Sequence, residues 1–147
     1  LSAHRDAPAA GRASGVRWPD SSREVSLSTH EVGRRCEAIA ARFLTEAGWT
    51  VLERNVRFRR KEIDLVLRRG RVVAFVEVKG RKGGGWGHPL DAITALKRRE
   101  IETVARWWVD RFGRPGDHYR FDAVAVHVRG LDVVRVEHVE DAWRSGE

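Results

Sequence analysis

The sequence predicts an α/β domain built on a mixed, five-stranded sheet flanked by helices. Two segments carry apolar residues at helical spacing, and five others have the apolar runs and short turns that are typical of strands. These segments follow one another as helix, three strands, helix and two strands, without an internal repeat. With 147 residues, 41% of them hydrophobic, the chain can bury a core and is not a wholly disordered protein.

The start of the ordered domain is indicated by a change in composition. Residues 1–27 contain Ala, Gly, Ser, Pro and isolated arginines without any period, which predicts a flexible basic leader. We expect residues 28–147 to form a single domain that contains all the predicted helices and strands.

The first helix is predicted over residues 29–47. Ser28 and Glu31 have the serine-x-x-glutamate spacing of a capping box, which satisfies the free N–H groups at a helix start. Apolar residues then recur every three or four positions up to Gly48, a residue type that commonly ends a helix.

Three strands are expected at residues 49–58, 62–67 and 72–79. The last two flank the turn sequence 68–71, which contains a glycine, so they should pair as an antiparallel hairpin. Residues 72–78 of the third strand are apolar on both faces except for Glu77, which favours a central position in the sheet.

The second half of the domain begins with a glycine-rich segment, residues 80–87, which we interpret as a mobile loop. A second helix is predicted over residues 90–112. Two further strands, 119–128 and 131–139, surround a short turn, and residues 141–144 have the length of one helical turn.

Composition and charge limit the classes of function. The 28 Lys and Arg residues outnumber the 21 Asp and Glu residues, and the resulting charge of +7 favours a polyanionic partner such as nucleic acid. The longest uncharged apolar run, residues 72–76, is far shorter than the ~20 residues of a membrane span. A single cysteine, Cys36, excludes an internal disulfide, and no segment resembles a signal peptide, so we expect a cytoplasmic protein.

A group of charged residues on two strands could carry chemistry. Glu77 and Lys79 share a face because side chains alternate along a strand, although both could simply lie in water at the strand end. Asp64 interrupts an apolar run on the partner strand of the hairpin, which brings it close to Glu77. Two converging carboxylates repel each other, which raises a pKa or recruits a hard divalent cation such as Mg²⁺ or Mn²⁺.

These residue types fit the hydrolysis of a phosphodiester. A divalent cation between Asp64 and Glu77 would bind a phosphate oxygen and lower the pKa of a bound water. The ammonium group of Lys79 would orient that water or neutralise the charge that develops on the phosphate.

Two helical residues are further candidates. Glu37 lies at the border of the apolar stripe of the first helix, from which it could reach the metal as a ligand or a base, or remain exposed or paired with an arginine. Lys97 lies within the apolar stripe of the second helix and must extend to solvent or meet an anion. An internal ion pair between Lys97 and Glu100 is the alternative.

Several segments together resemble a known family. Glu77-Val78-Lys79, with Glu77 thirteen positions after Asp64, resembles the signature of the PD-(D/E)xK nucleases. More of the chain is similar to the YraN-like family of predicted bacterial endonucleases, which are related to archaeal Holliday-junction resolvases. The matching pieces are Gly33 through Ala38 with Ala41, Gly48, Arg54 through Arg57, Glu62 through Leu65, Phe75 through Lys79 with Arg81, Lys97, and Arg120-Phe121-Asp122.

The resemblance implies a restriction-endonuclease-like core and assigns roles. It implies that Asp64 and Glu77 bind the metal together with the backbone carbonyl of Val78, that Lys79 is the catalytic lysine, and that Glu37 is a carboxylate near the site. Cys36 and Lys61 stand where the family usually has glycine. The role of Asp122 is not visible in the pattern, and we expect it to pair with Arg120 or another arginine.

The sequence therefore predicts a Mg²⁺- or Mn²⁺-dependent endonuclease that acts on DNA, including branched or junction DNA. Arg81, Lys82, Trp86 and Lys97 are the predicted nucleic-acid contacts. Trp86 could stack on an unpaired base or fold back onto the core. By analogy, cutting both sides of a branched DNA would favour a homodimer. The alternatives are a non-catalytic nucleic-acid-binding module and an adaptor that keeps the nuclease fold.

Overall fold

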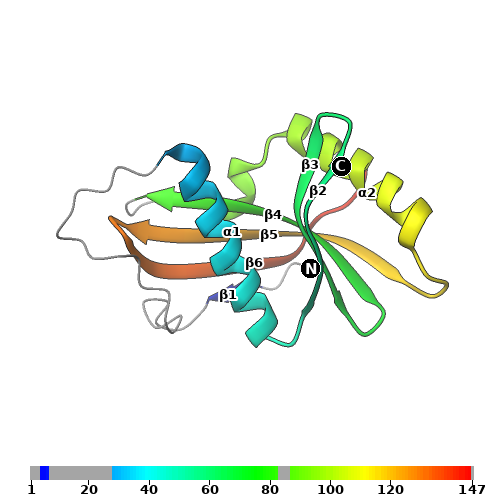
Figure 1. The fold of residues 1–147 in the computed structure, drawn as a ribbon, viewed down its shortest axis with the longest axis horizontal. Coiled ribbons are helices and arrows are strands. Elements are labelled where there is room, and N and C mark those ends of the chain that lie inside the picture. Colours follow the sequence, from blue (N-terminus) through cyan, green and yellow to red (C-terminus); the bar gives the residue numbers. More distant parts are fainter. Residues whose placement is uncertain (1–3, 7–27, 83–86, 147) are drawn as a thin grey trace.

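The computed structural model describes residues 4–6, 28–82 and 87–146 of the chain (Figure 1). These residues form, in chain order, β1 (His4–Asp6), α1 (Thr29–Glu46), β2 (Thr50–Phe58), β3 (Lys61–Arg69), β4 (Val72–Lys82), the short 3-10 helix η2 (Pro89–Ala92), α2 (Ala95–Phe112), β5 (His118–Arg129) and β6 (Asp132–Trp143). Neither α1 nor α2 combines the length and the hydropathy that a membrane-spanning helix requires.

The strands form one mixed sheet with the order β1-β6-β5-β4-β3-β2. Among the described strands only β4 and β5 pair in parallel, and α2 lies between them in the chain, as a parallel connection requires. The five strands from β2 to β6 confirm the predicted mixed sheet. The edge strand β1 lies inside the segment expected to be a leader and was not predicted; residues 1–3 and 7–27 of that segment lie outside the described residues.

The two helices cover opposite faces of the sheet. Figure 1 shows α1 crossing one face of β4, β5 and β6. Alternate side chains of β3 and β4 enter two separate cores, because successive residues of a strand point to opposite faces. Leu65 and Val76 pack in the core that contains α1, whereas Val66 and Phe75 pack in the core that contains α2.

The first helix begins and ends where the sequence predicts. The Ser28 hydroxyl accepts a hydrogen bond from the Glu31 N–H at 3.1 Å, so the expected N-terminal cap is present. At the other end, Gly48 has a φ of 99°, a left-handed conformation that glycine adopts at low cost.

Three predicted boundaries are wrong. Strand β4 continues through residues 80–82, where it pairs with β5, and residues 83–86 of the expected loop lie outside the described residues. The second helix begins at Ala95 rather than at residue 90, because the Thr94 side chain caps it by accepting from the Lys97 N–H. Residues 141–143 extend β6 instead of forming a helical turn, because Trp143 pairs with β5 beyond a bulge.

A buried polar cluster joins β5 to β6 away from the predicted site. The carboxylate of Asp122 accepts two hydrogen bonds from Arg120, each 3.0 Å long, so the expected ion pair is present. The same carboxylate lies 2.7 Å from His138 Nε2 and accepts a hydrogen bond from the Asp141 N–H at 3.0 Å. We refer to Arg120, Asp122, His138 and Asp141 as the Asp122 cluster.

Candidate functional site

The predicted carboxylates meet where the β3–β4 ladder ends. The antiparallel pairing runs from Arg69 opposite Val72 to Leu65 opposite Val76. The same register, continued by one residue, places Asp64 opposite Glu77. The short turn between the two strands therefore brings these two side chains together, and the strands separate just beyond them.

Asp64 lies at a local rotation of β3. Ile63 packs in the core on the α2 side, whereas Leu65 packs in the core on the α1 side, although residues two apart in a regular strand share a face. This change of face lets the Asp64 carboxylate lie between the two layers. One of its oxygens accepts a hydrogen bond of 2.7 Å from the backbone N–H of Val78 on β4. Asp64 thus lies against the backbone of the residue whose carbonyl was the third expected metal ligand.

Glu77 is a buried carboxylate with few partners. It is 3% exposed, and its Oε1 lies 3.3 Å from the ammonium group of Lys79. Its Oε2 is buried without a hydrogen-bond partner among the described residues. An unpartnered carboxylate oxygen is costly to bury, so this atom is suited to an additional ligand such as a cation.

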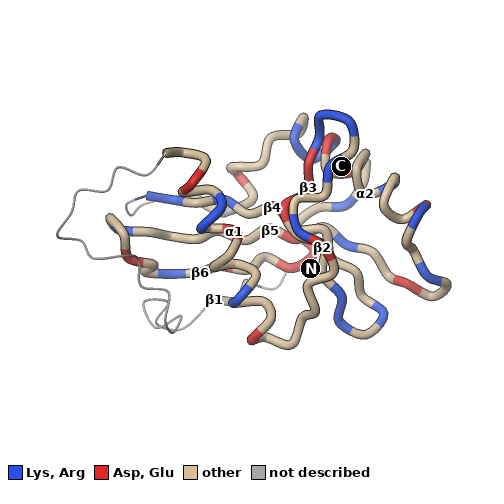
Figure 2. Tube along the Cα trace, viewed as in Figure 1, with Lys and Arg blue, Asp and Glu red and all other residues tan. Residues whose placement is uncertain are grey.

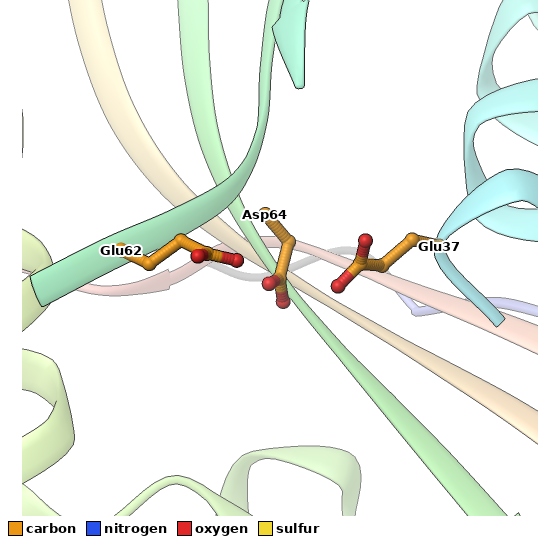
Figure 3. Close-up of side chains that lie close together, drawn as sticks. All are labelled: Glu37, Glu62 and Asp64. Atoms are coloured by element: carbon orange, nitrogen blue, oxygen red, sulfur yellow. The ribbon is translucent and has the colours of Figure 1, made fainter. Parts of the chain in front are cut away.

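Glu37 of α1 brings a further carboxylate close to Asp64. Figure 3 shows the Asp64 side chain between those of Glu37 and Glu62. One oxygen from each of the three carboxyl groups lies within 4.8 Å of the others. Glu62 was not predicted as a site residue. Its position two residues before Asp64 on the same strand was the available signal, since that spacing favours a common face.

Asn55 of β2 connects two of these carboxylates. With its amide oriented to donate, Asn55 Nδ2 lies 2.9 Å from Glu37 Oε2 and 3.0 Å from Glu62 Oε1. Glu62 also accepts a hydrogen bond of 2.8 Å from Arg57 Nε. Asn55 lies in a segment that resembles the family, but its role is not predictable from the sequence.

The gathered carboxylates have raised pKa values. Burial, followed by the charge of Asp64, raises the pKa of Glu37 to about 7. The same two causes raise the pKa of Glu77 to about 7, against the opposing charges of Lys97 and Lys79. Burial also raises the pKa of Asp64, although the Val78 N–H partly offsets it. Near neutral pH, ionisation of all three of these carboxyl groups at once is therefore unfavourable.

The predicted nucleic-acid contacts have different positions. Lys97, in the first turn of α2, is close enough for its charge to lower the pKa values of both Asp64 and Glu77, and it forms no ion pair with Glu100 among the described residues. Arg81 and Lys82 lie at the end of β4, beyond Lys79, with Lys82 exposed. Trp86 lies outside the described residues.

A cleft of about 550 Å³ opens beside the carboxylates. Its lining comprises Thr29, His30, Gly33, Arg34, Glu37, Asn55, Arg57 and Glu62, from α1 and the β2–β3 hairpin. Lys and Arg residues are spread over α1, this hairpin and α2 (Figure 2). Acidic side chains thus lie within a surface that carries many cations, an arrangement suited to a polyanion whose phosphate approaches a metal ion.

The donor set fits a hard divalent cation. Mg²⁺ and Mn²⁺ prefer carboxylate and carbonyl oxygens, the atom types that Asp64, Glu77 and the backbone of Val78 carry, and the Val78 backbone N–H contacts the Asp64 carboxylate. The buried, unpartnered Oε2 of Glu77 and the raised pKa values of the carboxylates are the observations that support this fit. A bound cation would offset the mutual repulsion of the carboxylates.

Comparison with known proteins gives a consistent family. The uncharacterised protein family UPF0102 matches residues 36–126. The chain is 43% identical over 121 residues to a UPF0102 protein of Chlorobium chlorochromatii, covering 79% of this chain and 93% of the relative. It is 42% identical over 112 residues to one of Rhodococcus jostii, covering 76% and 95%. It is 44% identical over 117 residues to one of Symbiobacterium thermophilum, covering 80% and 99%. These matches confirm the YraN-like resemblance: the chain belongs to the UPF0102 family.

Proposed function

We propose that this protein is a metal-dependent endonuclease that hydrolyses phosphodiester bonds in DNA, including branched or junction DNA. The observation that carries the proposal is the group of Glu37, Glu62 and Asp64, whose carboxylate oxygens lie within 4.8 Å of one another, next to the buried Glu77. The charge of Asp64 raises the pKa of Glu77, and Glu77 Oε1 lies 3.3 Å from the ammonium group of Lys79. Such a concentration of buried and half-buried, mutually repelling charges destabilises a fold, and sites of this kind are enriched at functional centres.

The residues have separate roles in this proposal. Asp64, Glu77 and the Val78 carbonyl hold Mg²⁺ or Mn²⁺, which when bound polarises a phosphate oxygen and lowers the pKa of a water. Lys79, which lies 3.3 Å from Glu77, places positive charge where the phosphate gains negative charge.

Glu37 is the proposed proton acceptor. With a pKa raised to about 7, it can accept the proton of the attacking water near neutral pH. The water oxygen forms a bond to phosphorus while the bond from phosphorus to the leaving oxygen of the sugar breaks. The leaving oxygen then takes a proton from solvent.

Binding of the substrate rests on charge rather than on sequence reading. The net charge of +7 favours contacts with the DNA backbone, and Arg81, Lys82 and Lys97 are the proposed phosphate contacts. Trp86 is proposed to stack on an unpaired base of branched DNA. Two copies acting on one junction would cut both sides, so we propose a homodimer, and we place the activity in the cytoplasm.

A substrate panel tests the activity. Labelled single-stranded, duplex, flap and four-way-junction DNAs are incubated with the purified protein and either Mg²⁺ or Mn²⁺. We expect cleavage of at least the branched substrates. Lys79→Ala and Glu77→Gln should each lower the rate by at least about 100-fold, since charge stabilisation and metal binding both depend on these residues.

Matched controls separate the intrinsic activity from a contaminating nuclease. Glu46→Gln, an exposed carboxylate on α1, should cleave like the wild type. Loss of cleavage in Glu77→Gln with retained folding and DNA binding supports the proposal. DNA binding without cleavage of any substrate under either metal would instead favour the non-catalytic module, and full activity of Glu77→Gln would exclude this site.

A further inference from the structure

Asn55 has an unusual backbone conformation for a residue inside a strand. Its φ is 52°, in the left-handed region that asparagine tolerates better than most other residues. The β2–β3 pairing of Arg54 with Leu65 and of Val56 with Ile63 places Asn55 opposite Asp64. The conformational exception of β2 thus coincides with the rotation of β3 at the proposed metal ligand.

The amide of Asn55 lies between carboxylates of two different elements. Its nitrogen carries two hydrogens, and the two oxygens within reach belong to Glu37 on α1 and Glu62 on β3, at 2.9 and 3.0 Å. These carboxylates repel each other and Asp64, and charge-assisted hydrogen bonds to one shared amide favour their close approach. Asn55 is the only asparagine in the 147 residues, and the chain has no glutamine.

We propose that Asn55 is a positioning residue of the candidate site. Its amide joins Glu37 to Glu62 and thereby fixes the Glu37 carboxylate beside Asp64, while its left-handed backbone allows the β2–β3 hairpin to turn these side chains toward α1. Asn55 acts through Glu37, and the catalytic consequence of this inference rests on the proposed function.

Two substitutions separate the amide from the backbone. Asn55→Gly keeps access to the left-handed conformation and removes the amide, whereas Asn55→Asp keeps the shape and replaces the donor with an acceptor. Arg59→Gly is the matched control, because Arg59 has a φ of 58° in the exposed turn of the same hairpin. We expect kcat to fall about 10- to 100-fold in both Asn55 variants, with the KM for DNA unchanged, and no change in Arg59→Gly.

A double-mutant cycle tests whether Asn55 acts through Glu37. The variant Asn55→Gly/Glu37→Ala should be no slower than Glu37→Ala alone, because the carboxylate through which the amide acts is then absent. In the double variant Asn55→Gly/Lys82→Ala, the fold-losses in cleavage rate of the two single variants should instead multiply. Wild-type kcat in both Asn55 variants, or multiplication of the Asn55 and Glu37 effects, would overturn the proposal.

A spectroscopic test does not depend on cleavage. Because the chain contains a single side-chain carboxamide, its ¹⁵N-labelled form should show one pair of side-chain NH₂ signals, and these disappear in Asn55→Asp. We expect Glu37→Ala to shift these signals and Glu46→Ala, on the exposed side of α1, to leave them unchanged. If Glu37→Ala shifts the Asn55 signals but the wild-type protein cleaves no DNA, the contact between Asn55 and Glu37 is supported and the proposed function is rejected. Signals unaffected by Glu37→Ala would reject the positioning role whatever the activity.

Discussion

Two buried carboxylates of this molecule, Asp122 and Glu77, have opposite surroundings. Asp122 is fully buried and has four nitrogen partners between 2.7 and 3.0 Å, from Arg120, His138 and the backbone of Asp141. Glu77 is nearly as buried, but one oxygen faces only Lys79 at 3.3 Å and the other has no hydrogen-bond partner within the described part of the chain.

The difference indicates what each cluster contributes. Donors surround Asp122, so the desolvation of its charge is compensated and the cluster ties β5 to β6. At the candidate site carboxylates face one another, and their burial is compensated only in part. A fold keeps such an arrangement against its stability when another requirement selects it, and the proposed cation is that requirement here.

The largest expected effect is on the stability of the Asp122 cluster. Asp122→Ala leaves the partly buried Arg120 guanidinium without its closest partner and should lower the free energy of unfolding by about 3–5 kcal/mol. Thermal unfolding followed by circular dichroism should show a Tm lower by about 10–20 °C. If this variant does not fold, Asp122→Asn, which removes the charge but keeps the shape of the side chain, should show a smaller loss of stability. A Tm within 2 °C of the wild type, on the order of 1 kcal/mol or less, would remove the contrast between the clusters.

The next effect is the pH dependence of stability in the presence of a chelator. The folded pKa of Glu77, about 7, lies above its unfolded value of 4.5, so the folded state binds more protons between these values. The free energy of unfolding should therefore fall as the pH rises from about 4.5 to 7, by up to about 3 kcal/mol from this group, with Glu37 acting in the same direction.

Urea titrations at several pH values measure this slope. Asp117, whose pKa is held well below its usual range by Arg68, contributes the opposite sign at lower pH: its stabilisation is lost as the pH falls through its folded pKa. Millimolar Mg²⁺ should flatten the decline above pH 6, since the cation binds the ionised folded state. A free energy of unfolding that rises between pH 5 and 7 without metal would contradict the raised pKa of Glu77.

A smaller effect is expected from neutralising Glu77. Glu77→Gln removes the buried charge and its repulsion with Asp64, so at pH 8 without metal it should raise the free energy of unfolding by about 1 kcal/mol, although it loses the contact with Lys79. Urea unfolding measures the change, and the pH slope should shrink in parallel. Asp122→Asn is the control and should change stability in the opposite direction. Destabilisation by Glu77→Gln would show that this carboxylate is compensated in the folded protein.

The parts of the fold and site that could be predicted depend on short-range patterns. The capping box fixed the start of α1, and alternation along β4 put Glu77 and Lys79 on one face. The short turn between β3 and β4 set the register that brings Asp64 opposite Glu77. Each of these features depends on residues that are close in the sequence or joined by a short turn.

The features that could not be predicted from the sequence depend on how separate helices and strands pack together. The contact between Asn55 and Glu37 requires the placement of α1 against β2, together with a left-handed residue that no hydrophobic pattern reveals. The rotation of β3 at Asp64 follows from the packing of Ile63 and Leu65 in different cores, which depends on the twist of the hairpin between them. Strand β1 was missed because a three-residue edge strand has too few side chains to show a period.

The smallest changes in stability are expected from two half-exposed cations, Arg69 beside the Asp122 cluster and Lys79 beside the candidate site. Comparing these two residues separates an effect on stability from an effect on cleavage. The Arg69 and Lys79 side chains are 39% and 37% exposed, and each lies beside a more buried carboxylate, Glu140 or Glu77. Glu140 borders the Asp122 cluster, since its Oε1 lies 3.7 Å from Arg120 Nη2 and 4.0 Å from His138 Nδ1. Arg69 also stacks over the Trp49 ring at 4.3 Å. Because water screens charges at such exposure, Arg69→Ala and Lys79→Ala should each change the free energy of unfolding by less than about 1 kcal/mol.

Their effects on cleavage should differ by at least about 100-fold, since only Lys79 faces the proposed phosphate position. Urea unfolding and the junction-cleavage assay on the two purified variants give both quantities from one preparation. Equal cleavage rates in Arg69→Ala and Lys79→Ala would mean that the two clusters do not differ in function. Equal stability with unequal cleavage would show that the cation beside Glu77 serves the reaction and that the cation beside Glu140 does not.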